Sequence, residues 1–303
     1  MRKVIQLLFS FFVYVVLSQS CSVLSESQIS SIEALTIKSD SMVNAPSAIF
    51  HSLDHIRLQR GLFYVASLDI PENRIEELDA LAKAKVEDEK RSAKADTYVS
   101  VLESYIRAVK SLASDQRSTA IGREFRGIGN NIDSIVISYN ILLDGQLPEG
   151  ISKLSGKSLG FIAENVTKGT QFKFLKEFMT VGDSLVAGCC DTLISILKGE
   201  DLNNLIKNEK EGLDNNFKAY LYEMERLGVV PPIECYQQFL MLKERVIAVS
   251  DLRNASVRAL RSFKNAHHKI VEKLSQKQDI DITEDLFELT KLTYDICLAV
   301  KKI

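Results

Sequence analysis

Two long stretches of this chain lack any helix-breaking residue, and they constrain the fold more than any other feature. One runs over residues 71–114 and the other from Ile233 to about Lys277; proline occurs only as the first residue of the former. As a single helix, the first stretch would be roughly 65 Å long at 1.5 Å per residue. Helices of this length must cover one another's apolar faces, so the sequence predicts an elongated fold.

The apolar residues of both stretches follow the spacing of packed helices. In the first they step by threes and fours, as in a coiled coil: Ala95, Tyr98, Leu102, Tyr105, Val109 and Leu112. Short turns between the predicted helices require antiparallel neighbours, and no segment shows the alternation of a strand. We therefore expect an all-α fold, an elongated antiparallel up-and-down bundle with helices of about 40 residues.

Composition divides the chain into three segments. Residues 1–20 read as a signal peptide, residues 21–45 as a serine-rich tether with little periodicity, and residues 46–303 as the helical bundle. The clearest break in the bundle is the glycine- and proline-containing segment 144–150. It marks a possible boundary within the bundle.

The N-terminal residues have the layout of a secretory signal. Arg2 and Lys3 precede an uncharged apolar run over residues 4–17, which leads through Ser18 and Ser20 to Cys21. A run of 14 residues matches the core of a signal and is shorter than the ~20 residues that span a bilayer. We expect export, with cleavage after Ser20.

The cysteine at the end of this layout resembles the lipobox of a bacterial lipoprotein signal, in a loose form with Ser18 in place of the usual aliphatic residue. The resemblance implies that Cys21 becomes the first mature residue and is the lipid attachment site, carrying acyl chains such as palmitate that hold the protein on a membrane. Ser22, where retained lipoproteins have Asp, implies the outer membrane, facing either the periplasm or the surface. No specific family is recognised for the helical body.

Ordinary signal cleavage is the alternative to lipidation. Ser18 and Ser20 satisfy the preference for small residues at alternate positions before a cut. The mature protein would then be soluble, with Cys21 as an N-terminal thiol.

The charge balance excludes one class of partner. The chain has 38 basic and 40 acidic residues, a net charge of −2. Non-specific nucleic-acid binding requires a basic excess that replaces counterions, so we expect no nucleic-acid partner.

The cysteines after Cys21 lie in apolar helical stretches, where thiols act as small apolar residues. They are Cys189, Cys190, Cys235 and Cys297. Export into an oxidising compartment permits one bridge, which would join Cys189 or Cys190 to Cys235 or Cys297. No Cys-x-x-Cys or histidine partner lies at the spacing of a metal site.

The histidines offer weak candidates for chemistry. His51, Asp54 and His55 are similar to the zinc motif His-x-x-Glu-His, but Asp replaces Glu and no third ligand is evident, so a chance match is the simpler interpretation. His267 is expected at the edge of the core and His268 in solvent. We therefore predict no catalytic, cofactor-binding or metal-binding residue, and no enzyme.

One segment is apolar nearly all round. Over residues 181–197 only Asp183 and Asp191 carry charge. Such a helix is buried centrally or enters a membrane, and central burial is the simpler interpretation.

Three functional hypotheses follow. The first is a lipid-anchored cell-envelope protein that acts as a non-enzymatic scaffold, adaptor or assembly factor through helical contacts with an unknown protein partner. The alternative is a membrane-active, pore-former-like helical protein that inserts segment 181–197. A third is an enzyme whose site is not visible in the sequence.

Overall fold

The computed structural model describes residues 24–40, 42–114, 168–276 and 278–303. Every regular element within these ranges is an α-helix, so the all-α prediction is confirmed. The helices are α2 (Glu26–Asp40), α3 (Ala45–Ser67), α4 (Pro71–Ala113), α7 (Lys168–Lys198), α8 (Glu200–Arg226), α9 (Ile233–Gln276) and α10 (Thr283–Val300).

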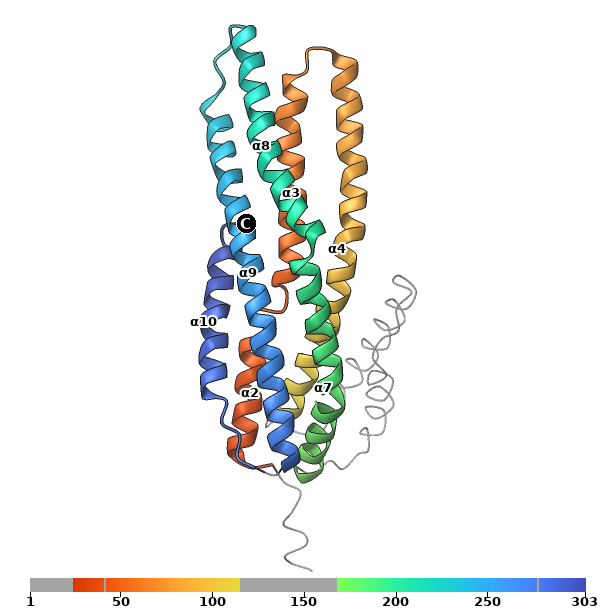
Figure 1. Ribbon diagram of the computed structural model, residues 1–303, viewed down its shortest axis with the longest axis vertical. Coiled ribbons are helices and arrows are strands. Elements are labelled where there is room, and N and C mark those ends of the chain that lie inside the picture. The colour runs from red at the N-terminus through yellow and green to blue at the C-terminus, as the bar shows by residue number, and fades with distance from the viewer. Residues whose placement is uncertain (1–23, 41, 115–167, 277) are drawn as a thin grey trace, which may run out of the picture.

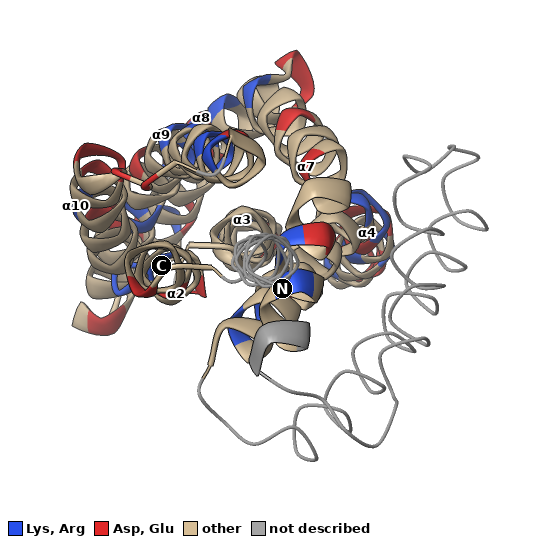
Figure 2. Ribbon diagram, turned by 90° about the horizontal axis from the view of Figure 1, so that it is seen from below, with Lys and Arg blue, Asp and Glu red and all other residues tan. Residues whose placement is uncertain are grey.

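The helices form an elongated up-and-down bundle (Figure 1). α2 and α3 follow one another along one column, and α4 returns beside α3. α7 and α8 form a second column, α9 returns beside it, and α10 packs against the lower part of α9. Seen along the bundle, α3 lies among the other helices (Figure 2), with α4, α8 and α9 packed against it.

Two of the helices expected to be long have the predicted lengths. α4 has 43 residues and begins at Pro71, whose missing N–H is not needed in the first turn. α9 has 44 residues. The apolar positions predicted for α4, from Ala95 to Leu112, are all buried.

The prediction of an irregular tether is wrong for the part of residues 21–45 that the structure describes. Glu26–Asp40 is a helix, α2, with Ile32 and Leu35 buried. Its serines do not prevent the helix: the hydroxyl of Ser39, for example, donates to the carbonyl of Leu35 at 2.7 Å. Tertiary burial has overridden a weak local preference.

The two ends of the bundle differ. At one end, the start of α2 meets the α9–α10 loop, where the amide of Gln28 donates to the carbonyl of Gln278 at 2.8 Å. The opposite end carries the turns that join α3 to α4 and α8 to α9 (Figure 1). We call this opposite end, comprising residues 68–75 and 227–233, the distal end.

A glycine sets the geometry of the α8–α9 turn. Gly228 has a φ of 65°, in the left-handed region that favours glycine. The N–H of Val229 donates to Met224 and that of Gly228 to Glu225, so the last carbonyls of α8 are satisfied in the manner of a Schellman cap. Pro231 and Pro232 then separate α8 from α9.

Some predicted features lie outside the described residues. They are the signal peptide with its cleavage point after Ser20, the lipid attachment site Cys21, and the possible boundary at residues 144–150.

Candidate functional site

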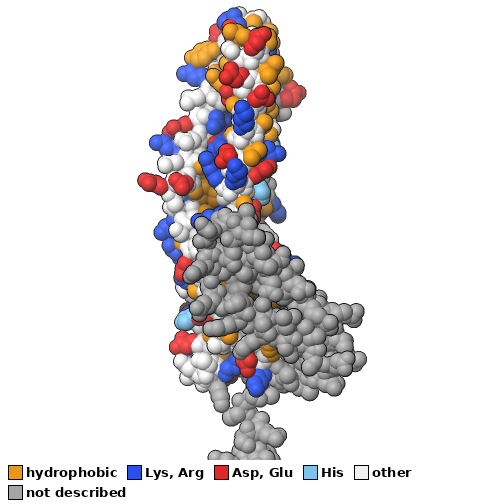
Figure 3. All heavy atoms as spheres, turned by 90° about the vertical axis from the view of Figure 1, so that its right-hand side faces the viewer, with side chains coloured by type: hydrophobic (Ala, Val, Ile, Leu, Met, Phe, Trp, Pro, Cys, Tyr) orange, Lys and Arg blue, Asp and Glu red, His pale blue; other side chains and the backbone are white. Residues whose placement is uncertain are grey.

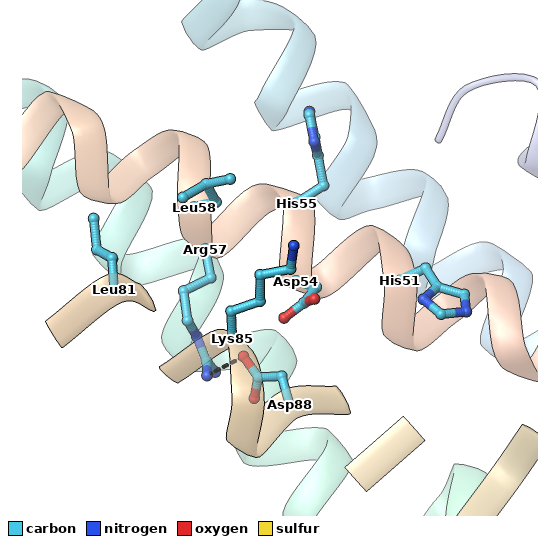
Figure 4. A pocket seen from close by; sticks show the side chains of 8 residues that line it. All are labelled: His51, Asp54, His55, Arg57, Leu58, Leu81, Lys85 and Asp88. Carbon is cyan, nitrogen blue, oxygen red and sulfur yellow. Dashed lines mark hydrogen bonds and ion pairs between the residues drawn. The ribbon is translucent and has the colours of Figure 1, made fainter. Parts of the chain in front are cut away.

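A cavity of about 200 Å³ lies between α3 and α4, midway along the bundle (Figure 4). It is lined mainly by polar side chains: His51, Asp54, His55, Arg57, Leu58, Leu81, Lys85 and Asp88. This cavity contains the residues of the zinc-like motif found in the sequence.

An ion-pair cluster beside the cavity joins α3, α4 and α8. Arg57 contacts Asp88 of α4 at 2.5 Å and Glu209 of α8 at 2.8 Å. Arg60 contacts the second oxygen of Glu209 at 2.5 Å. The Glu209 side chain is fully buried, so its charge is balanced entirely by the two arginines. We call Arg57, Arg60, Asp88 and Glu209 the arginine cluster.

Two carboxylates meet in the cavity. Burial, together with a hydrogen bond to the Asp88 carboxylate and its charge, raises the pKa of Asp54 to about 6. Arg57 opposes this shift without cancelling it. Acids and bases in the cavity thus largely neutralise one another, which leaves little net charge to attract an ionic ligand.

The histidines do not converge on these carboxylates. His51 and His55 point away from each other and from Asp54 (Figure 4). Burial lowers the pKa of His55, and the positive charge of the neighbouring Arg245 lowers it further. Among the described residues, no group of three or more His, Cys, Asp and Glu side chains is placed to hold a metal ion.

A second polar arrangement crosses the lower core from α4 to α9 and α7. The hydroxyl of Tyr105 lies 2.7 Å from Nε2 of His267, and Nδ1 of His267 lies 3.0 Å from Asp183. The other oxygen of Asp183 lies 2.8 Å from Nδ1 of His268. With His267 and His268 each carrying a proton at Nδ1, every one of these contacts has a donor and an acceptor.

The Tyr105–His267 part of this chain of contacts is closed to substrate. Tyr105 and His267 are each 1% exposed, and the Tyr105 ring is stacked on Phe178 with centroids 5.4 Å apart. Burial raises the pKa of Tyr105, and the hydrogen bond from His267 lowers that of Asp183. The arrangement therefore fixes the register of three helices.

The sequence identified only part of this network. His267 is buried and His268 exposed, as predicted. In the sequence, Asp183 stands out only as a charge within an apolar segment. A charge in such a segment is itself a sign that the folded chain supplies a hydrogen-bonding partner for it. Asp191, the other interruption, pairs with Lys264 at 2.6 Å.

The described cysteines are free thiols. Cys189 and Cys190 are buried in α7, and burial raises the pKa of Cys189 to about 12. Cys235 is half-buried, 3.4 Å from the hydroxyl of Tyr220, and Cys297 is exposed. The buried pair acts as small apolar side chains, as expected.

Segment 181–197 lies in α7, and its apolar side chains face the core. Leu185, Val186, Leu193 and Leu197 are fully buried. By length and composition, the stretch from Gln171 to Arg226 could cross a membrane, although a core helix passes the same test. Asp183 and Asp191 contact His267 and Lys264 of α9, so both charges of this segment have partners within the bundle.

The distal end exposes apolar side chains. Val230 is 87% exposed, and Ile233, at the start of α9, is 64% exposed. Ile70 and Ile75, at the neighbouring α3–α4 turn, are also exposed. On the face seen in Figure 3, acidic and basic side chains are intermingled with apolar ones towards this end. Exposed apolar residues that gather at one end of a fold indicate an interaction surface.

No protein-family model, curated protein or solved structure matches this chain.

Proposed function

We propose that this protein is a lipid-anchored adaptor of the bacterial cell envelope, held by acyl chains on Cys21 and acting through protein contacts made at its distal end. One observation carries the proposal: Leu24, three residues after Cys21, begins the described chain at one end of the bundle, and the exposed apolar turn lies at the other. The anchor and the contact surface would therefore be separated by the whole bundle.

The dimensions support this role. α9 alone is roughly 66 Å long at 1.5 Å per residue. A rigid helical spacer of this length would present the distal end well beyond the lipid headgroups. Restriction to a surface would also raise the effective concentration of the adaptor for partners there.

The core supports a non-enzymatic role. Tyr105 and His267 are buried, and the arginine cluster is internally neutralised. Neither the Tyr105–His267 pair nor the arginine cluster exposes a nucleophile or general base of the kind that enzymes use.

The test combines lipid labelling with site-directed photocrosslinking. A photoreactive phenylalanine analogue at Val230, in cells that express the full chain, should give a discrete crosslinked protein, whereas the same analogue at the exposed Glu272 near the opposite end should not. Cys21→Ala should abolish palmitate incorporation and reduce the Val230 crosslink. Equal crosslinking from both positions, or a Val230 crosslink that is independent of Cys21, would contradict the proposal.

The membrane-active alternative is separated by a different assay. Insertion of segment 181–197 would have to break the contacts of Asp183 and Asp191 with α9, which Asp191→Asn and Asp183→Asn would weaken. The adaptor proposal expects no dye release from liposomes for the native chain or for either variant. Dye release that increases in both variants and is lost in Leu185→Glu would favour insertion.

A further inference from the structure

The outward face of α9 changes character along its length. Every seventh residue from Ile233 lies on nearly the same face of a helix. In the distal half these positions are Ile233, Leu240 and Ile247, which are 64%, 60% and 62% exposed. In the other half they are Asn254, Arg261 and His268. We call Ile233, Leu240 and Ile247 the α9 stripe.

The α9 stripe is not part of the bundle core. α8 packs on a different face of α9, where Phe217 stacks on Phe239 with centroids 4.1 Å apart and Tyr220 contacts Cys235. α10 contacts the proximal half of α9, through Arg258 with Asp295 and through Lys269 with Asp285. Among the described helices, none covers the α9 stripe.

Single exposed aliphatic residues are normal on a protein surface, but a seven-residue repeat is not random scatter. Three apolar residues at this spacing form a narrow stripe along one face that a second helix can pack against. Tyr236, three residues after Ile233, borders the stripe on the side of α8, where its ring contacts Phe217 with centroids 5.9 Å apart. The stripe covers 15 residues, or roughly 21 Å of helix.

Acidic side chains flank one side of the stripe. Glu244 follows Leu240 by four residues and Asp251 follows Ile247 by four, so both lie beside it. Both are exposed, and neither forms an ion pair with another described residue. On the side of α8, Lys243 is already paired with Asp214 at 2.8 Å.

This charge pattern indicates which kind of molecule would bind the α9 stripe. An antiparallel pair of copies would align the acidic row of one chain with that of the other, which disfavours self-association. Anionic lipid would meet the same carboxylates. A helix with lysine or arginine beside its apolar stripe would gain opposite-charge pairs with Glu244 and Asp251.

We propose that the distal half of α9 docks one amphipathic helix of a partner protein, whose apolar seven-residue stripe packs on Ile233, Leu240 and Ile247 and whose basic flank faces Glu244 and Asp251. This inference rests on the proposed adaptor function and names its class of partner. The contact is a helix laid along an exposed seam, with side chains three, four and seven residues apart as anchors.

The test uses two synthetic 21-residue helices with the same apolar stripe, one flanked by lysine and one by glutamate. Binding to the full chain in detergent is measured by fluorescence anisotropy. The lysine-flanked peptide should bind at least about ten-fold more tightly than the glutamate-flanked one, and the difference should shrink at high salt. Equal binding of both peptides, or binding of neither, would overturn the proposal.

Substitutions on α9 and α10 test whether the peptide binds at the α9 stripe. Leu240→Glu should weaken the lysine-flanked peptide about ten-fold or more, while the matched control Phe287→Glu, on the exposed face of α10, should leave it unchanged. The double variant Glu244→Lys with Asp251→Lys should reverse the preference between the two peptides. Unaltered binding in Leu240→Glu, with circular dichroism confirming the fold of each variant, contradicts the assignment.

Two further measurements test whether a second copy of this chain or a lipid bilayer covers the α9 stripe instead. Sedimentation equilibrium should show no dimer that Leu240→Glu dissociates. Vesicles of phosphatidylglycerol and phosphatidylethanolamine should not bind the chain through Leu240. A positive result in either replaces the helix partner with a second copy or a bilayer. If neither peptide binds while the Val230 crosslink still depends on Cys21, the helical partner is contradicted and the anchored adaptor is not. If the lysine-flanked peptide binds but the Val230 crosslink does not depend on Cys21, the anchored adaptor is contradicted and the helix-binding surface is not.

Discussion

The hydroxyl of Tyr105 lies 2.7 Å from Nε2 of His267, and both side chains are buried between α4 and α9. The two residues are 162 positions apart in the chain, so this contact fixes how two of the longest helices align. A hydrogen bond in such surroundings is costly to lose because the remaining partner cannot turn to water.

Tyr105→Phe should destabilise the protein by about 1–3 kcal/mol, because it leaves Nε2 of His267 without a donor in the core. The change is read from the midpoint of urea unfolding followed by circular dichroism. Tyr294→Phe is the matched control, since Tyr294 is exposed on α10, and it should change stability by less than about 0.5 kcal/mol. Equal effects of the two substitutions would show that the hydroxyl of Tyr105 contributes nothing specific.

Gly182→Ala should destabilise the protein, although alanine favours a helix by about 1 kcal/mol. An added Cβ at Gly182 would approach the Tyr105 ring closely, and that ring is buried and cannot move aside. We expect a loss of about 1–3 kcal/mol, as for other overpacked cores. Ser184→Ala is the control, because Ser184 is exposed on the same helix and its replacement by alanine should not reduce stability. A thermal midpoint unchanged or raised in Gly182→Ala would contradict the packing seen here.

Stability should fall as the pH rises through the titration of Asp54. The pKa of Asp54 is raised from 3.8 to about 6, so between these values the folded chain keeps a proton that the unfolded chain releases. The free energy of unfolding therefore decreases from about pH 4 to pH 6 on account of this group. Asp54→Asn should remove this dependence and stabilise the protein at pH 8 by about 1 kcal/mol, a value reduced for solvent screening.

Urea unfolding at pH 4.5, 6 and 8 measures this effect. Asp79→Asn, at an exposed position of α4, is the control and should leave the pH profile unchanged. If the free energies of unfolding of Asp54→Asn and the native chain differ by the same amount at all three pH values, the pKa of Asp54 is not raised in the folded chain.

Glu209→Gln should destabilise the protein by about 3 kcal/mol, because it leaves Arg57 and Arg60 facing an uncharged group in a buried site. Glu211→Gln is the control: its side chain is exposed and lies 3.9 Å from Lys207, so its loss should cost less than about 1 kcal/mol. Denaturant unfolding compares the two. Similar values for both would mean that the arginine cluster contributes no more than a surface pair.

Local signals predicted the helices well, because they depend on nearby residues. Pro71 and the absence of a breaker before Ser114 gave both ends of α4. α2 was missed because its serines conceal a narrow stripe that includes Ile32 and Leu35, and only burial against other helices stabilises it.

The polar clusters could not be predicted from spacing. Arg57 and Glu209 are 152 residues apart, and Asp183 and His267 are 84 apart. Their pairing depends on the register between helices, which is set by the packing of whole faces and leaves no local trace in the sequence. The zinc-like spacing of His51 and His55 was misleading for a related reason: a helix repeat places two residues on one side but does not aim their side chains at a common point.

The first part of α4 is built differently from the rest. No side chain of α4 before Ser92 is buried, and the segment packs closely on α3 where Leu81 lies against Gly61. Asp88, held by Arg57, ties this segment to the body of the molecule. Beyond Asp88 the α4 segment can move away from α3 without opening the core, because its own side chains are not buried. α3 itself stays packed on α8 through Phe63 and Phe217. The molecule thus combines a rigid bundle with a more flexible segment of α4 at the distal end. Any change of shape on contact with a partner would be confined to this end, which faces away from Leu24.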